Sequence, residues 1–374
     1  MTWHEWLEQQ AAEREAAGLT RRLRARAAED PTVDLAGNDY LGLAHDPDVR
    51  RAAADAALAW GAGAAASRLV TGTLELHATL EAELADYLGQ PSALVLSTGY
   101  HANLAVVTAL ADRTTRVLSD AHIHASLVDA VRLSRARLTV VPHNDVDAVR
   151  AGLVAASAAG ERVLVLAESV YSVLGDAAPL TDLAALCAQH DALLVVDEAH
   201  GLGVHGPGLV AGLGLAGLPH VLVTATLSKS LGSQGGAVLG PAAVREHLVN
   251  RARPFIFDTG LAPAPTASAL AALRILRDRP ELSARVHRRV RELADALGVV
   301  APDGAVLSVP MPSPAAAVAA QAAALDGGVR VGCFRPPSVP DGVSRLRVTA
   351  GAGVSDEAWD RAVDVLRRVV KEHQ

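Results

Sequence analysis

The chain has 374 residues, half of them apolar and about a fifth charged, which is typical of a globular protein and not of a disordered one. Its formal net charge of −7, with scattered arginines, argues against a dedicated nucleic-acid surface. Cys187 and Cys333 cannot build a disulfide framework and lack zinc-type spacing. No apolar run approaches the ~20 residues of a membrane span, and residues 1–26 resemble a charged surface helix, so we expect a cytoplasmic protein.

Predicted helices and strands alternate over the first 265 residues. The helices are expected at 47–59, 75–88, 103–110 and 180–190. The strands are expected at 93–97, 115–120, 138–141, 163–167, 193–196 and 221–224. Because these strands are continuous apolar runs, both of their faces should be covered, and we predict a mostly parallel sheet in an α/β fold.

The remaining residues predict a smaller α+β domain. Helices at 266–278 and 281–297 precede strands at 306–309, 329–334 and 345–349. A last helix should begin at Ser355, with Asp356 and Glu357 in its first turn. We therefore divide the chain into an N-terminal segment (1–45), a large domain (46–265) and a small C-terminal domain (266–374).

Polar residues follow several of the predicted strands, where ligands bind in parallel sheets. They are residues 119–120, 168–172, 197–200 and 226–229. A second feature is the strand–glycine turn–helix sequence around Gly99, which can aim free backbone N–H groups at an anion such as phosphate. Many α/β proteins have such a turn with nothing bound, so this signal is weak by itself.

Lys229 is one of only two lysines in a chain with 32 arginines, and the other, Lys371, lies three residues from the C-terminus. Lysine, unlike arginine, can lose its proton and serve as a nucleophile. Composition alone leaves a chance surface lysine equally open. Asp197 ends the strand before that of Lys229. Pyridoxal 5′-phosphate chemistry requires a lysine, an aspartate at a strand end, a phosphate-binding turn and nearby histidines.

Two other motifs can be dismissed. Residues 201–206 have the spacing of a dinucleotide-binding turn, but Pro207 and Gly208 prevent a helix from opening there, and no acidic residue follows about 20 positions on. Residues 197–200 also resemble the metal-binding box of a helicase. The chain lacks the GxxxxGK[ST] phosphate loop that such a motor needs.

Over nearly its whole length the sequence resembles the α-oxoamine synthases, which are fold-type I pyridoxal-phosphate-dependent transferases. The matching segments are 38–43 (NDYLGL), 97–103 (STGYHAN), 124–127 (HASL), 196–201 (VDEAHG), 226–229 (TLSK) and 332–340 (GCFRPPSVP). The last segment and Arg21 favour the branch that condenses L-alanine with a pimeloyl thioester, in biotin biosynthesis. The alternative is a sister enzyme that condenses glycine with another acyl-CoA, of the 2-amino-3-oxobutyrate or 5-aminolevulinate type.

The resemblance implies a role for each matching residue. Lys229 would hold the cofactor covalently and move the Cα proton, Asp197 would pair with the pyridine nitrogen, and His124 would stack on the ring. The other implied cofactor contacts are Gly99, Tyr100, Ser172, His200, Thr226 and Thr259 of the partner subunit. The implied substrate contacts are Arg21, Asn38, His124, Arg335, which would grip the amino-acid carboxylate, and Ser338.

The same resemblance implies a homodimer with shared active sites and leaves open whether pimeloyl arrives on coenzyme A or a carrier protein. We expect no metal, nucleic-acid or membrane partner. The chain departs from the family pattern at residues 63–67, where alanines replace glycines, at Leu174, where an acidic residue is usual, and at His122, an extra histidine. A non-catalytic cofactor-binding or interaction protein on the same scaffold remains an alternative, although the complete lysine, aspartate and histidine set argues against it.

Overall fold

The computed structural model describes residues 1–374 except 18, 22, 337–338 and 340, and it divides into two compact units, residues 1–32 and 33–374. The first unit contains α1 (Trp3–Ala16), which is shorter than the predicted helix. A capping box opens α1, because Thr2 and Glu5 each accept a hydrogen bond from the other's backbone N–H. The predicted boundaries after residues 45 and 265 stay predictions.

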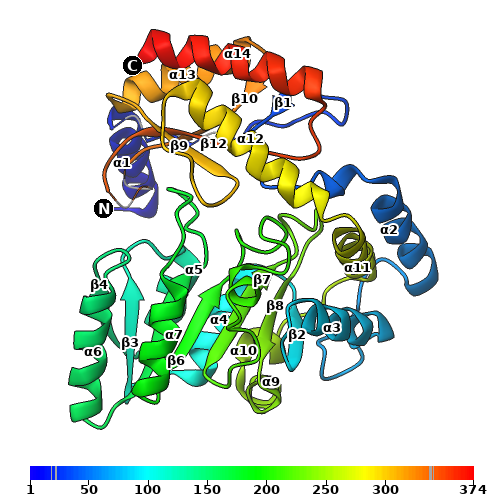
Figure 1. The fold of residues 1–374 in the computed structure, drawn as a ribbon, viewed down its shortest axis with the longest axis vertical. Helices are drawn as coiled ribbons and strands as arrows, with labels where there is room; N and C mark the ends of the chain where they lie inside the picture. The colour runs from blue at the N-terminus through cyan, green and yellow to red at the C-terminus, as the bar shows by residue number, and fades with distance from the viewer. Residues whose placement is uncertain (18, 22, 337–338, 340) are drawn as a thin grey trace. The chain divides into compact units, whose positions relative to one another are not determined.

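A seven-stranded sheet forms the centre of the second unit, in the order β2-β8-β7-β6-β5-β3-β4 (Figure 1). Its strands are β2 (Ser92–Leu96), β3 (Thr115–Asp120), β4 (Arg137–Val141), β5 (Arg162–Glu168), β6 (Leu193–Asp197), β7 (Val221–Thr226) and β8 (Gly236–Gly240). Strands β3 to β7 pair in parallel, and only β8 runs antiparallel to its two neighbours, β7 and β2. The predicted α/β class with a mostly parallel sheet is confirmed.

Both faces of this sheet are covered by helices, which explains the continuous apolar strands. In β7, Val223 and Ala225 pack into one core while Leu222 packs into the other. One core includes α4 (Gly99–Leu110), α5 (Ala125–Ser134), α9 (Ala242–Arg251) and α10 (Arg253–Ile256). The other includes η1 (Leu43–His45), α2 (Pro47–Trp60), α3 (Glu75–Tyr87), α6 (Val146–Ala158), α7 (Leu180–Gln189), α8 (Leu209–Gly212) and α11 (Pro263–Asp278).

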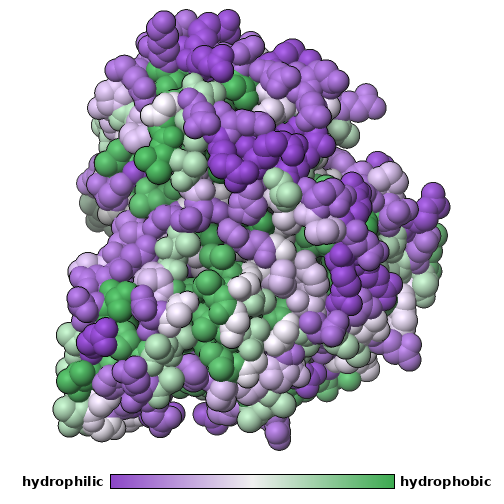
Figure 2. All heavy atoms as spheres, viewed as in Figure 1, coloured by the Kyte–Doolittle hydropathy of each residue, from purple (hydrophilic) through white to green (hydrophobic). Residues whose placement is uncertain are grey.

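The C-terminal part has its own antiparallel sheet and its own core. Strands β9 (Val306–Pro310), β11 (Gly332–Phe334) and β12 (Arg345–Thr349) form the sheet, in the order β11-β12-β9. Helices α12 (Glu281–Leu297), α13 (Pro314–Asp326) and α14 (Asp356–His373) contribute to this core, and the outer faces of α12 and α14 are hydrophilic (Figure 2). Ser355 caps α14 as predicted, because its side chain accepts a hydrogen bond from the Ala358 N–H.

One predicted strand is divided in the structure. Residues 329–334 form β10 (Val329–Arg330), which pairs in parallel with β1 (Val33–Asp34), and β11, which pairs with β12. The two pairings leave Val331 between the strands. Within the described ranges, no helix is long and apolar enough to cross a membrane.

Candidate active site

A cavity of ≈260 Å³ opens where β5, β6 and β7 end. It is lined by Thr98, Gly99, Tyr100, Asn103, His124, Ser126, Glu168, Asp197, Ala199, His200, Ala225, Thr226, Ser228 and Lys229. Seven of the predicted site residues are among them: Gly99, Tyr100, His124, Asp197, His200, Thr226 and Lys229. The sheet brings them together because its parallel strands all end at the same edge.

The Lys229 amine lies beside a histidine. Its Nζ is 2.8 Å from His200 Nε2, and His200 Nδ1 is 2.7 Å from the hydroxyl oxygen of Tyr40. Burial lowers the pKa of Lys229 to about 8, although the negative charge of Asp197 acts in the opposite direction. Burial, followed by the charge of Lys229, lowers the pKa of His200 well below its usual value, so this imidazole is neutral. At pH 7 about a tenth of Lys229 is therefore the free amine that a nucleophile requires, far more than for an ordinary lysine.

Asp197 is held in one orientation by neutral donors. Its Oδ2 accepts a hydrogen bond from Asn103 Nδ2 at 2.7 Å, and its Oδ1 accepts one from the Ala199 N–H at 2.8 Å. The Thr224 hydroxyl donates to Asn103 Oδ1 at 2.6 Å, which fixes the amide in turn. A carboxylate fixed by amides keeps its charge available for a protonated nitrogen in the cavity.

His124 stands at the start of α5 and is tied to the same network. Its Nδ1 lies 2.7 Å from the Ser126 hydroxyl, which also accepts a hydrogen bond from Asn103 Nδ2 at 2.8 Å. Burial lowers the pKa of His124, which favours a neutral ring facing the cavity. Ser126 thus links the predicted stacking histidine to the amide that holds Asp197.

An anion can bind where α4 begins. The Thr98 side chain accepts a hydrogen bond from the His101 N–H, whereas the N–H groups of Gly99 and Tyr100, in the first turn, have no partner within the helix. A Cβ on Gly99 would lie 2.9 Å from Thr226 Cβ, so glycine is needed for this close approach. The Thr226 hydroxyl faces the same cavity, 2.8 Å from the Ser228 hydroxyl. These donors and the available space fit the phosphate group of pyridoxal 5′-phosphate.

The sequence missed Arg347, an arginine beside this site. Arg347 Nε donates to the Ser172 carbonyl at 2.9 Å, and its Nη1 donates to Asn38 Oδ1 at 3.2 Å. All five residues of β12 are buried, and an arginine inside a buried strand was the signal that could have identified it. Arg335, which was predicted to grip the substrate carboxylate, directly follows β11 and is not among the described residues that line the cavity.

The other predicted site residues lie outside the cavity lining. Ser172 faces Arg347 through its carbonyl, and its N–H donates to Glu168 Oε2. Thr259 is exposed and forms an isolated β-bridge with Ser67. Arg21 belongs to the N-terminal unit, and Ser338 lies outside the described residues. Their roles stay predictions.

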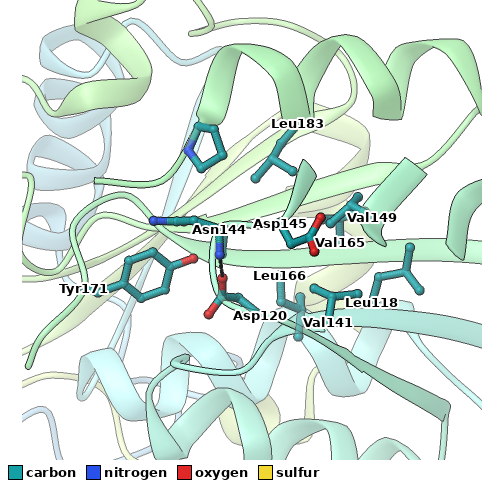
Figure 3. A pocket seen from close by; sticks show the side chains of 12 residues that line it. Leu118, Asp120, Val141, Asn144, Asp145, Val149, Val165, Leu166, Tyr171 and Leu183 are labelled. Carbon is teal, nitrogen blue, oxygen red and sulfur yellow. Dashed lines mark hydrogen bonds between the residues drawn. The ribbon is translucent and has the colours of Figure 1, made fainter. Parts of the chain in front are cut away.

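A second cavity, between β3, β5 and α7, is much smaller, at ≈10 Å³ (Figure 3). Its lining is mostly apolar, and Asp120 at its edge accepts a hydrogen bond from the Asn144 N–H at 2.8 Å. His143 bridges Asp120 and Asp176 at 2.9 and 2.8 Å, and the extra histidine, His122, stacks on His143 with 3.8 Å between ring centres. His122 is therefore part of this neighbouring cluster, and the cavity is too small for a substrate.

The fold and the site define a pyridoxal-phosphate-dependent transferase of fold type I. The chain belongs to the class I and II aminotransferase family, whose sequence profile matches residues 30–366. A solved structure described as "SPT with PLP" is 30% identical, with a TM-score of 0.91, and covers 100% of this chain and 99% of that one. The serine palmitoyltransferase of Sphingomonas wittichii is 31% identical, with the same coverage and TM-score.

Its relatives include the 8-amino-7-oxononanoate synthases, which confirms the resemblance inferred from the motifs. Those of Mycolicibacterium paratuberculosis and Mycolicibacterium smegmatis are 56% and 55% identical over 98% of this chain and 96% of each relative. A solved 8-amino-7-oxononanoate synthase from Francisella tularensis shares the fold, at 24% identity and a TM-score of 0.77 over 92% of this chain and 99% of that one. Pyridoxal 5′-phosphate is the cofactor that this family membership and the neighbouring structures support.

Proposed function

We propose that this chain condenses L-alanine with a pimeloyl thioester, giving 8-amino-7-oxononanoate, CO₂ and the free thiol, in biotin biosynthesis. The observation that carries the proposal is the placement of Lys229 and Asp197 in one cavity, in a chain 53–56% identical to 8-amino-7-oxononanoate synthases. The sister reaction with glycine is not favoured, since eight relatives that are 53–56% identical to this chain all have the same name.

Different lining residues would contact different parts of the cofactor. Lys229 would hold it covalently, Asp197 would pair with its ring nitrogen, and His124 would lie against the ring. The N–H groups of Gly99 and Tyr100 would hold the phosphate. When bound, pyridoxal 5′-phosphate supplies a protonated ring that delocalises the negative charge developing on the amino-acid Cα.

The remaining steps depend on side chains of this chain. Lys229 Nζ removes the Cα proton of alanine and later returns a proton to the product, which its lowered pKa of about 8 makes possible. Neutral His200 accepts or donates one hydrogen bond at this amine without adding charge. Arg347, held by Asn38, binds the alanine carboxylate through a charge-assisted hydrogen bond until CO₂ leaves.

We further propose a homodimer whose interface lies beside the cavity. Leu69, Val70 and Phe257 are 52%, 74% and 68% exposed, which is high for apolar side chains. The segments that carry them are joined, because the Gly260 N–H donates to the Ala66 carbonyl. Burial of this surface by a second copy would place Thr259 of the partner subunit near the phosphate. Coenzyme A and carrier protein both remain candidate acyl carriers, and a cytoplasmic location stays a prediction.

The test is spectroscopic and kinetic. Purified protein should be yellow, its spectrum should change with alanine more than with glycine, and pimeloyl thioester should outperform acetyl and succinyl thioesters. Borohydride reduction followed by mass spectrometry should place the cofactor on Lys229. Lys371→Ala is the matched control and should keep both the adduct and the activity, because Lys371 is exposed on α14. An adduct elsewhere, or a preference for glycine, would contradict the proposal.

A further inference from the structure

Glu168 is a buried carboxyl group of the cavity to which the motifs gave no role. It is the last residue of β5, its side chain is 2% exposed, and it lines the cavity. In the parallel pairing of β5 with β6, Glu168 is the register partner of Asp197. Register partners in a parallel sheet project from the same face, so two carboxyl groups lie side by side in a low-dielectric site.

The two carboxyl groups differ in their hydrogen bonds. Both oxygens of Asp197 accept a hydrogen bond from a fixed amide. Glu168 Oε2 accepts the Ser172 N–H at 3.2 Å, and the His124 N–H also faces this carboxyl group, but Oε1 has no hydrogen-bond partner among the described residues. A buried ionised oxygen without a partner costs several kcal/mol, whereas an unpaired oxygen of a neutral carboxyl group costs less.

The neighbouring charges favour the same division. Burial, followed by the negative charge of Asp197, raises the pKa of Glu168 well above its usual value, and the charge of Lys229 acts in the opposite direction. The Lys229 amine contacts His200 and forms no salt bridge with either carboxyl group. His124 and His200 face the same space, and burial lowers the pKa of both, so neither supplies a positive charge.

Two further groups act on Glu168 from other elements. Tyr40, from the segment before η1, and Tyr171, in the loop after β5, both lie near Glu168, and burial is the main reason that the pKa of each is raised. Both phenols are therefore neutral. Arg347 donates to the Ser172 carbonyl and to Asn38 Oδ1, and no ion pair between Arg347 and Glu168 is found among the described residues.

We propose that Glu168 keeps its proton at neutral pH and offers the cavity a neutral carboxylic acid whose hydroxyl hydrogen bonds an oxygen of the bound substrate, while Asp197 carries the carboxylate charge. Pairs of carboxyl groups whose environments separate their protonation states commonly divide acid and base roles in this way. The substrate contact rests on the proposed function, whereas the retained proton does not.

The retained proton can be tested by thermal unfolding of the full-length protein, with and without cofactor, from pH 5 to pH 8. Glu168→Gln replaces the neutral acid by an uncharged group of the same shape. Wild type should lose stability relative to this variant as pH rises, because the unfolded chain releases the Glu168 proton first. The melting temperature of the variant should gain on wild type by roughly 2 °C per pH unit.

Glu81→Gln is the matched control. Glu81 is also buried, but Arg68 and Arg245 bind its two oxygens at 2.9 and 3.2 Å, so its charge is paired. This variant should be less stable than wild type throughout the range. Infrared spectra at pH 7 should contain a carboxylic-acid C=O band that Glu168→Gln removes and Glu81→Gln retains. If Glu168→Gln folds poorly, Glu168→Met should show the same pH trend.

If the difference in melting temperature between Glu168→Gln and wild type is the same at every pH, or if the advantage of the variant grows as pH falls, Glu168 is ionised and the proposal is overturned. The substrate contact has its own measurement. The kcat/KM of wild type should fall at alkaline pH as the Glu168 proton is lost, and Glu168→Gln should lack that fall, whereas identical profiles would refute the contact. Absence of any turnover of alanine with pimeloyl thioester would instead contradict the proposed function and leave the unfolding result intact.

Discussion

Lys229 should reduce the stability of the cofactor-free protein, and Lys229→Met should restore it. The fall of its pKa from 10.5 to about 8 corresponds to about 3 kcal/mol of unfavourable free energy. Because the side chain is only partly buried, solvent screening reduces this to about 2 kcal/mol. Loss of the hydrogen bond to His200 costs about 1 kcal/mol, so the variant should gain about 1 kcal/mol at pH 7.

The size of the Lys229 penalty depends on pH, whereas a packing effect would not. Above pH 10.5 the amine is neutral in both the folded and unfolded chains, so Lys229 carries no penalty there. The penalty grows as pH falls towards 8 and is constant below that value. Urea unfolding of the cofactor-free protein at pH 7 and pH 10 measures the difference, with Lys371→Met, on exposed α14, as control. A Lys229→Met variant that is less stable at pH 7, or whose advantage is the same at pH 10, would refute the reasoning.

Three further perturbations follow from the described contacts. Arg347→Lys should raise the KM for alanine about 10–100-fold, because lysine cannot make both fixed hydrogen bonds that orient the guanidinium group; an unchanged KM would contradict it. Burial opposes protonation of His143, but two carboxylate hydrogen bonds raise its pKa. His143→Gln should therefore lower the free energy of unfolding by about 1–2 kcal/mol at pH 6 and by less at pH 9. A loss in denaturant titrations that is the same at both pH values would contradict the assignment. Ala65 has a φ of +63°, a conformation that glycine adopts more readily than alanine. Ala65→Gly should therefore raise the free energy of unfolding by about 0.5 kcal/mol, while Ala66→Gly should lower it by about as much. Equal effects of the two substitutions on the melting temperature would argue against strain at Ala65.

The sequence predicted the strands well because burial on both faces produces continuous apolar runs. Predicted strand 115–120 coincides with β3, and the others agree within a few residues. β8 was missed because glycines at both of its ends, Gly236 and Gly240, resemble a turn. Its antiparallel direction could not be inferred without the strand. This omission also concealed why Gly236 is required, since a Cβ there would lie 2.4 Å from the Thr98 carbonyl oxygen, next to the anion-binding turn.

The strand-end rule predicted the convergence of Asp197 and Lys229 because it needs only strand order and direction. It could not predict Arg347, whose position beside Asn38 depends on packing between residues 309 apart in the chain. Asn103 was also missed. In the sequence it resembles an ordinary residue of α4. The structure shows that its amide forms hydrogen bonds with Thr224, Ser126 and Asp197. Polar groups that orient a catalytic side chain become visible only when tertiary contacts are known.

The distribution of charge explains why these groups share one cavity without neutralising one another. Arg347 supplies a fixed positive charge beside Asn38, and Asp197 supplies a fixed negative charge beside Asn103. His200 is neutral, and the Lys229 amine contacts His200 rather than Asp197, so neither side chain forms an ion pair with Asp197. An amino acid presents a carboxylate and an amine that must reach different partners, and a cavity with its charges separated in this way can bind both ends at once.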